Sequence, residues 1–312
     1  MTDDRRWDVL GVGDADVDLF LATPSLPGHD EKVLGRLLGE FPGGVVANFC
    51  HATAKLGART AFATVVGSDT YGELALAGLR RAGVNLDLAL VKEGGRTYFC
   101  VVLLDATGEK ALTVVETDCM APRPDEVDPE QFARTRLVHL MASNLDDTIW
   151  YAREAKKRGA LVSLDVEPTT IGSDSARFRE LLSSVDLAFP NLAGLRRLAG
   201  RDELEDARHL LGWGPQLVVV TMGAAGCLIV SGEEVRRVPA FDVPVADTTG
   251  AGDCFNGAFV TAHLRGWDFE RCGRFAAAAA AIAIQSVGSQ VGVPTFAEVQ
   301  AFLASRGHGH GD

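Results

Sequence analysis

A glycine pair and a carboxylate stand together at the start of a predicted helix in this 312-residue chain. Residues 247–259 read DTTGAGDCFNGAF, in which Gly250, Ala251 and Gly252 precede Asp253 and the pattern then becomes helical. The first turn of a helix offers unpaired backbone N–H groups and the positive end of its dipole, both of which attract anions. The stretch therefore predicts an anion-binding site that also contains a negative charge.

The carboxylate of Asp253 would repel a bound phosphate if binding were its only task. A hydroxyl that attacks a phosphoryl group needs a base beside it, while backbone N–H groups stabilise the charge on the phosphoryl oxygens. The alternative is an ordinary helix cap, because aspartate is common in first turns. Asp247, Thr248 and Thr249 could already serve as caps. We therefore favour Asp253 as a catalytic base.

The sequence contains no good match to two other phosphate-binding loop motifs. The pattern GxxxxGK[ST] does not occur, and the nearest candidate for GxGxxG is the segment from Gly11 to Asp16. There Asp16 replaces the third glycine and no helical pattern follows, which argues against a dinucleotide-binding fold.

Short apolar runs alternate with amphipathic stretches along most of the chain. This alternation predicts a doubly wound α/β fold, a mostly parallel sheet with helices on both faces. Within segment 14–41, and again within segment 97–116, strand patterns follow one another with no helical pattern between the strands. We expect them to form a small β-sheet beside a large α/β domain made of residues 1–13, 42–96 and 117–312.

The second of these segments alternates in polarity along a predicted strand. Period-2 alternation places Phe99, Val101 and Leu103 on one face of the strand, expected to point outward. An exposed apolar face on a thin sheet is a candidate dimer surface.

Composition excludes several classes of protein. The formal net charge is −12, and no basic block is present that could neutralise a nucleic-acid backbone. The six cysteines lack CxxC or zinc spacing, which predicts reduced thiols. The first residues lack the apolar core of a signal peptide, and the apolar run 276–284 is too short to span a membrane. We expect a cytoplasmic protein.

The motif DTTGAGDCFNGAF resembles the C-terminal signature of the PfkB, or ribokinase-like, family of carbohydrate and nucleoside kinases. The segment Gly43-Gly44-x-x-Ala47-Asn48 is similar to the N-terminal signature of that family, with Cys50 where a smaller residue is usual. Further similarities run in the expected order over nearly the whole chain, at 11–16, 221–226 and 288–290.

The resemblance implies a large doubly wound domain with a small β-sheet lid, with the acceptor between them and ATP across the helix start. It implies that Asp253 is the base and that the backbone amides of residues 251–253 form the anion hole. The residues implied to hold a sugar are Asp14, Asp16, Gly43, Gly44 and Asn48. Those implied on the nucleotide side are Asn191, Thr221, Gly223, Gly226 and Gly288. For Asp14 and Asp16 the alternative is a solvated turn, and for Asn48 it is a residue at a helix start.

One departure from the family concerns Mg²⁺. Members commonly carry an Asn-x-x-Glu element that helps to position Mg²⁺ and phosphate, whereas this chain has Asn191 followed by Gly194 in the glutamate position. Glu167 could compensate from a neighbouring strand end.

A monovalent cation is a further implication. In relatives that use K⁺, the ion would take oxygens from the segment that here contains Asp247 and Thr249 and from the loop near Gly288. The alternative is that Asp247 only caps the turn.

These observations together favour an ATP-dependent kinase of a sugar or related polyol that forms a homodimer through the lid. A nucleoside or sugar-phosphate kinase of the same fold is the first alternative, and cationic residues available for a phosphate are Lys32, Arg36, Arg96 and Lys110. The second alternative is a sugar-binding relative with weakened catalysis, supported only by the missing glutamate.

Overall fold

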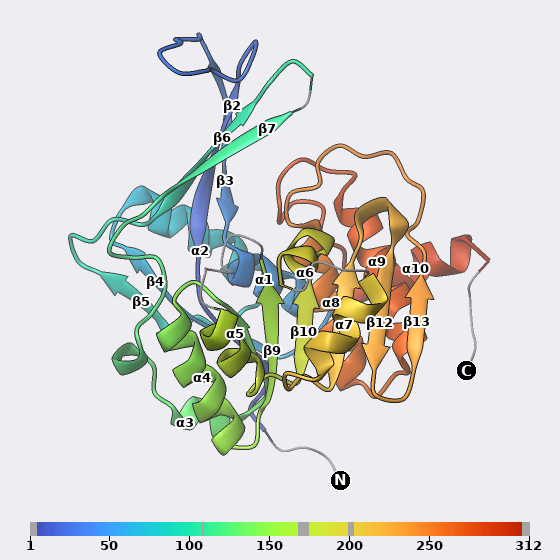
Figure 1. Cartoon of the computed structure of the whole chain (residues 1–312). Helices are drawn as coiled ribbons and strands as arrows, with labels where there is room; N and C mark the ends of the chain where they lie inside the picture. Colours follow the sequence, from blue (N-terminus) through green and yellow to red (C-terminus); the bar gives the residue numbers. More distant parts are fainter. Residues whose placement is uncertain (1–4, 108, 168–174, 199–202, 308–312) are drawn as a thin grey trace.

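The computed structural model describes residues 5–107, 109–167, 175–198 and 203–307, which Figure 1 shows as a large layered unit from which a small sheet projects. Within these ranges the large sheet has nine strands in the order β13-β12-β11-β10-β9-β8-β1-β4-β5. The strands from β5 to β11 in this order run parallel, and β12 and β13 add an antiparallel edge. Their bounds are β1 (Trp7–Val12), β4 (Thr60–Gly67), β5 (Ala89–Lys92), β8 (Thr135–Met141), β9 (Leu161–Val166), β10 (Leu187–Pro190), β11 (Leu217–Thr221), β12 (Cys227–Ser231) and β13 (Val235–Val238).

Helices cover both faces of this sheet, as the alternation predicts (Figure 1). The core on one face includes residues of α1 (Val45–Lys55), α2 (Thr70–Ala82), α8 (Ala251–Leu264), α9 (Phe269–Ala283) and α10 (Phe296–Ser305). The core on the other face includes residues of α3 (Glu130–Ala133), α4 (Leu145–Lys157), α5 (Ser175–Leu182), α6 (Leu192–Leu198) and α7 (Glu203–Leu211). Successive residues of β1 serve both cores, since Val9 packs on the first side and Leu10 on the second. The predicted doubly wound α/β fold is confirmed.

The small sheet stands at the carboxyl ends of the parallel strands (Figure 1). It has the order β3-β2-β6-β7, and its strands are β2 (Asp16–Ala22), β3 (Arg36–Gly43), β6 (Phe99–Leu104) and β7 (Lys110–Val115). Strands β2 and β6 pair in parallel, although they come from distant parts of the chain, and β6 and β7 form a hairpin. The strands of this sheet come from the two segments that lacked predicted helices, with β3 continuing to Gly43. The division into two domains with the boundaries given above stays a prediction.

The faces of the small sheet differ in part from expectation. Phe99, Val101 and Leu103 share a face, but each is half-buried, and the Phe99 ring packs edge-on against Tyr71 of α2 with centroids 5.7 Å apart. The more exposed apolar side chains of this sheet lie on its outer strands: Leu37 and Leu38 on β3, and Leu112 and Val114 on β7. The expectation missed this because alternation assigns a face but cannot show which helix packs on it.

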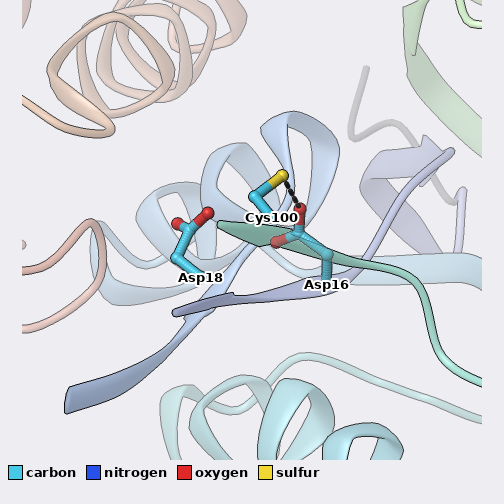
Figure 2. A group of neighbouring side chains, drawn as sticks. All are labelled: Asp16, Asp18 and Cys100. Carbon is cyan, nitrogen blue, oxygen red and sulfur yellow. Dashed lines mark hydrogen bonds between the residues drawn. The ribbon is translucent and has the colours of Figure 1, made fainter. Parts of the chain in front are cut away.

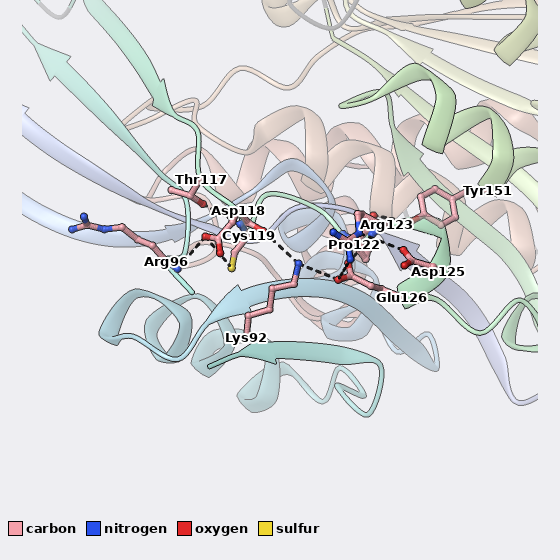
Figure 3. A network of polar contacts seen from close by, with 10 residues as sticks. All are labelled: Lys92, Arg96, Thr117, Asp118, Cys119, Pro122, Arg123, Asp125, Glu126 and Tyr151. Carbon is pink, nitrogen blue, oxygen red and sulfur yellow. Dashed lines mark hydrogen bonds and ion pairs between the residues drawn. The ribbon is translucent and has the colours of Figure 1, made fainter. Parts of the chain in front are cut away.

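A polar network braces the two chain segments that lead into β6 and out of β7 (Figure 3). The Nζ of Lys92 lies 3.0 Å from Oε1 of Glu126 and donates to the carbonyl of Asp118 at 3.5 Å. The carboxylate of Asp118 accepts a hydrogen bond of 3.3 Å from the backbone nitrogen of Arg96. The entry and exit of the hairpin are therefore held to each other and to the large unit.

Two expectations from composition concern the whole chain. All six cysteines are buried and free, so no disulfide joins them. Within the described residues, no helix combines the length and the apolar character needed to cross a membrane.

Candidate active site

Helix α8 begins at the predicted anion-binding segment. Gly250 is its N-cap residue, with φ 73°, and no side chain caps the first turn. A Cβ at Gly250 would lie 2.6 Å from the Cβ of Ser289, whereas a Cβ at Gly252 would have no atom of the described residues within 4 Å apart from its chain neighbours and the backbone of its own helix. The helix start is thus tightly packed at Gly250 and open at Gly252, which leaves room for a ligand against the N–H groups of Gly252 and Asp253. The side chains of Asp247, Thr248 and Thr249, which the sequence offered as possible caps, do not cap this helix, but the carbonyl of Thr248 accepts a hydrogen bond of 3.2 Å from the backbone nitrogen of Ala251.

Asp253 lies buried in the first turn of α8. Its Oδ2 accepts a hydrogen bond of 2.9 Å from the Nδ2 of Asn48, and the Oδ1 of Asn48 accepts one of 3.1 Å from the Nε2 of Gln290. Burial raises the pKa of Asp253 to about 8, although the Asn48 hydrogen bond lowers it, and the charge of Glu167 adds to the increase. A carboxyl group with such a pKa is a stronger base than an ordinary carboxylate, and it can take a proton from a hydroxyl when it is in its charged form.

Asp14 is held at the start of α1. Its two carboxylate oxygens accept hydrogen bonds of 2.9 Å from the backbone nitrogens of Val45 and Val46, and Tyr98 donates to it at 2.7 Å. Gly44 comes directly before this helix with φ 97°, and a Cβ there would lie 2.7 Å from the carbonyl oxygen of Asp14. Asp14 and Gly44 thus fix the approach of α1 to the end of β1, and three donors already occupy the Asp14 carboxylate.

Asp16 and Asp18 lie side by side on β2, with Cys100 of β6 beside them (Figure 2). The Sγ of Cys100 donates to Oδ2 of Asp16 at 3.3 Å, while the buried Oδ1 of Asp16 has no hydrogen-bond partner among the described residues. A Cβ at Gly43 would lie 2.2 Å from that oxygen and 2.7 Å from Oδ2 of Asp18, so a glycine is required opposite the pair. Burial raises the pKa of both carboxyls, that of Asp18 to about 6. The free oxygen of Asp16 can accept a hydrogen bond from an acceptor hydroxyl.

Asp247 joins three parts of the structure. Its Oδ1 accepts from the backbone nitrogen of Thr249 at 3.0 Å and from Oγ1 of Thr249 at 2.7 Å, and its Oδ2 accepts from the backbone nitrogen of Gly288 at 3.0 Å. The Nζ of Lys110 donates to the same Oδ1 at 2.8 Å and to Oγ1 of Thr249 at 3.0 Å. Burial alone would raise the pKa of Asp247, but the Lys110, Thr249 and Gly288 hydrogen bonds lower it to about 2.

The residues expected on the nucleotide side follow the ends of β10 and β11. Asn191 and Thr221 are bridged across these strand ends, and Oδ1 of Asn191 accepts from the backbone nitrogen of Gly194 at 2.7 Å, capping α6. Gly223 begins a short 3₁₀ turn, η2 (Gly223–Ala225). At Gly226, φ is 87° and a Cβ would lie 2.0 Å from the carbonyl oxygen of Val238, so this turn requires glycine.

Sequence reasoning missed several residues of this region. Asn256 donates to Asp165 at 2.7 Å, both side chains are buried, and burial together with the Asp253 charge raises the pKa of Asp165. The position of Asn256 three residues after Asp253, on the same helix face, is the signal that could have found it. Asp18 could have been found from its spacing of two residues from Asp16 on a predicted strand.

The arrangement agrees with what comparisons with known proteins show. The model of the family described as pfkB family carbohydrate kinase matches residues 8–296. An ATP-dependent ribose-1-phosphate kinase of Halopiger xanaduensis is 31% identical over 96% of this chain and 98% of its own length.

Solved structures lead to the same family. The ribokinase of Arabidopsis thaliana, complexed with ribose and ATP, superposes with a TM-score of 0.83 at 28% identity, covering 95% of this chain and 98% of its own. A protein of E. coli described as a putative ribokinase II in complex with ATP and Mg²⁺ has a TM-score of 0.83 at 23% identity, covering 96% of this chain and 99% of its own, and shows the shared fold.

Proposed function

Because the chain belongs to the pfkB family of carbohydrate kinases, and is thus an ATP-dependent kinase, we propose that it transfers the γ-phosphate of ATP to a hydroxyl of an unphosphorylated sugar or related polyol. The observation that carries this proposal is the buried Asp253, held by Asn48 in the first turn of a helix whose N–H groups no side chain caps. That combination supplies a base and an anion hole within one turn.

The residues of the chain divide the work as follows. Asp253 takes the proton of the acceptor hydroxyl as its oxygen attacks, and Asn48 keeps the carboxylate pointed at that hydroxyl. The backbone N–H groups of Gly252 and Asp253 stabilise the charge on the transferred phosphoryl group, whereas the N–H of Ala251 already donates to the carbonyl of Thr248. Bound Mg²⁺ supplies charge neutralisation between the phosphates of ATP.

The acceptor class follows from charge. The charges that raise the pKa of Asp253 come from Glu167, Asp14 and Asp18, so its surroundings are negative. Such a site disfavours a phosphate on the acceptor and favours hydroxyl donors. Lys110, one of the cations considered for a sugar phosphate, is paired with Asp247. The name of the Halopiger relative keeps a sugar-phosphate kinase as the second candidate, and a nucleoside kinase remains a further alternative.

Glu167 is our candidate for the carboxylate missing at Gly194. It follows β9, is half-buried, and its charge acts on both Asp253 and Asp165. Carboxylates bind Mg²⁺ directly or through water. We propose that Glu167 takes this part, and that Asn191, Thr221, Gly223, Gly226 and Gly288 line the nucleotide side.

Two further parts of the proposal concern ions and assembly. K⁺ could bind to oxygens of Asp247 and Thr249, but it would have to displace the Lys110 ammonium that contacts both.

A homodimer through the small sheet is supported by its exposed leucines on β3 and β7. A cytoplasmic location stays a prediction.

One assay tests the proposal against its alternatives. ATP consumption is measured with ribose, fructose, a nucleoside and ribose 1-phosphate as acceptors. We expect turnover with an uncharged sugar and little with ribose 1-phosphate. Preference for ribose 1-phosphate or the nucleoside would show that the acceptor is a sugar phosphate or a nucleoside and not an uncharged sugar. Sugar binding without any ATP consumption would indicate a relative that has lost catalysis.

A further inference from the structure

Lys110 connects the small sheet to the segment that precedes the anion hole. It is the first residue of β7, and it contacts Asp247 and Thr249, which lie 137 and 139 positions further along the chain. Thr249 is followed directly by Gly250, the N-cap of α8. A movement of β7 would therefore pull on, or release, the residues that lead into this helix start.

Asp247 needs a positive charge beside it. Its side chain is only 6% exposed, and its other hydrogen-bond partners within the described ranges, the Thr249 hydroxyl and the backbone N–H groups of Thr249 and Gly288, are neutral. Within the described ranges, Lys110 is the cation that forms an ion pair with it. When one partner of a buried ion pair is removed, the remaining charge is left uncompensated, which is far more costly than losing an exposed pair.

Asp18 makes a positive charge beside Asp247 still more necessary. It lies on β2 of the same small sheet, and both the negative charge of Asp247 and the positive charge of Lys110 act on it. The carboxylates of Asp18, on the small sheet, and of Asp247, in the segment before α8, thus both interact with one ammonium group. Without that group they would repel each other and favour separation of the small sheet from the helix start.

We propose that the Lys110 ammonium is the resident monovalent cation of the Asp247–Thr249 segment, and that it couples the position of the small sheet to the anion hole. Lys110 is in this sense a positioning residue, and its effect on turnover rests on the function proposed above. Its side chain is 36% exposed, so the position is open to solvent ions once the ammonium is gone. A small inorganic cation can then take its place between the oxygens of Asp247 and Thr249.

The first experiment needs no turnover. Thermal unfolding of the ligand-free protein is measured in tetramethylammonium, Na⁺, K⁺ and ammonium salts at equal ionic strength, for the wild type, Lys110→Met and a control, Lys32→Met, at an exposed lysine of the same small-sheet region. We expect Lys110→Met to unfold a few degrees lower in tetramethylammonium and to regain most of this loss in K⁺ or ammonium. The wild type and Lys32→Met should unfold at the same temperature in all four salts.

A second variant locates the ion. In Lys110→Met/Asp247→Asn the buried charge is absent, so the response to K⁺ and ammonium should disappear. A response that persists in the double variant would place the ion elsewhere and overturn the proposal. So would a Lys110→Met protein that ignores the cation, or a wild type that itself requires K⁺.

Kinetics then tests the coupling. With any acceptor that the wild type phosphorylates, Lys110→Met should lower kcat several-fold in tetramethylammonium, and K⁺ or ammonium should restore it. Lys110→Arg, which keeps a positive charge, should retain most of the wild-type kcat in tetramethylammonium. An unchanged kcat in every salt would overturn the coupling. A wild type that phosphorylates no acceptor would instead contradict the proposed function, while the unfolding experiment would still decide the cation site.

Discussion

Asn48 and Asp253 are 205 positions apart in the chain, yet the amide of Asn48 donates a buried hydrogen bond of 2.9 Å to the carboxylate of Asp253. Close packing of α1 against α8 makes this contact possible, since a Cβ at Gly257 would lie 3.0 Å from the Cβ of Ala52. The hydrogen bond favours the charged form of a carboxylate that burial otherwise keeps protonated. The two sequence signatures therefore meet at the group that must accept a proton.

Removal of the base should abolish most of the activity. We expect Asp253→Asn to lower kcat by roughly 10²–10⁴-fold, the usual effect of losing a general base, with little change in ATP affinity. Asp242→Asn, at an exposed carboxylate outside the site, is the control. A variant at 253 that keeps more than about a tenth of the wild-type kcat would rule out the assignment.

The pH dependence should reveal both neighbours of the base. Asp253 acts in its charged form, so kcat/KM should rise with pH and level off above its pKa of about 8. Asn48→Ala removes the interaction that lowers this pKa and should move the rise to higher pH. Glu167→Gln removes a charge that raises it and should move the rise to lower pH. Shifts in the same direction, or none, in pH–rate profiles would contradict this account.

The two glycines at the start of α8 should respond differently to valine. In Gly252→Val the Cβ meets no atom of the described residues within 4 Å beyond its own helix, so the protein should fold and bind sugar but lose turnover because the side chain occupies the anion site. Gly250→Val combines φ 73° with a contact of 2.6 Å to Ser289, and should lower the unfolding temperature. Calorimetry and turnover measured on both variants check this. Normal turnover in Gly252→Val would mean that phosphate binds elsewhere.

Activity should require a divalent metal. Treatment with EDTA should abolish turnover and Mg²⁺ should restore it, because ATP phosphates need a bridging cation. If Glu167 replaces the carboxylate absent at Gly194, Glu167→Gln should raise the Mg²⁺ concentration needed for half-maximal rate several-fold. An unchanged Mg²⁺ requirement, titrated at saturating ATP, would remove Glu167 from the metal site.

The oligomeric state should depend on the small sheet. We expect light scattering at micromolar concentration to find a dimer, and Leu112→Glu on β7 to convert it into a monomer. Val245→Glu is a matched control, because Val245 is 60% exposed and Leu112 is 57% exposed, but Val245 lies outside this sheet. A wild type that is monomeric with and without substrate would contradict the proposal.

Local patterns in the sequence predicted the main sheet and the start of α8. Buried parallel strands are continuous apolar runs, and the sequence displays directly the glycine at 250 that the backbone there requires, with φ 73°. The antiparallel edge was less visible, because β13 reads VRRV and resembles a polar loop.

Contacts between distant segments could not be predicted in the same way. The pairing of Lys110 with Asp247 joins a strand of the small sheet to the segment before α8, and no local pattern records it. For the same reason the sequence offered Asp247 as a cap for α8, whereas its carboxylate holds Thr249, Gly288 and Lys110.

The parallel pairing of β2 with β6 has a consequence for the order of folding. Val17 pairs with Phe99, and the chain between them contributes β3, α1, β4, α2 and β5. Closing this loop costs entropy, and the pairing of β1 with β4 and of β4 with β5 already brings the start of β2 towards that of β6, so the small sheet should form after these strands. A newly made chain would then acquire its nucleotide side before it can enclose an acceptor. Pulsed hydrogen exchange should find the amides of β1 and β4 protected earlier than those of β6.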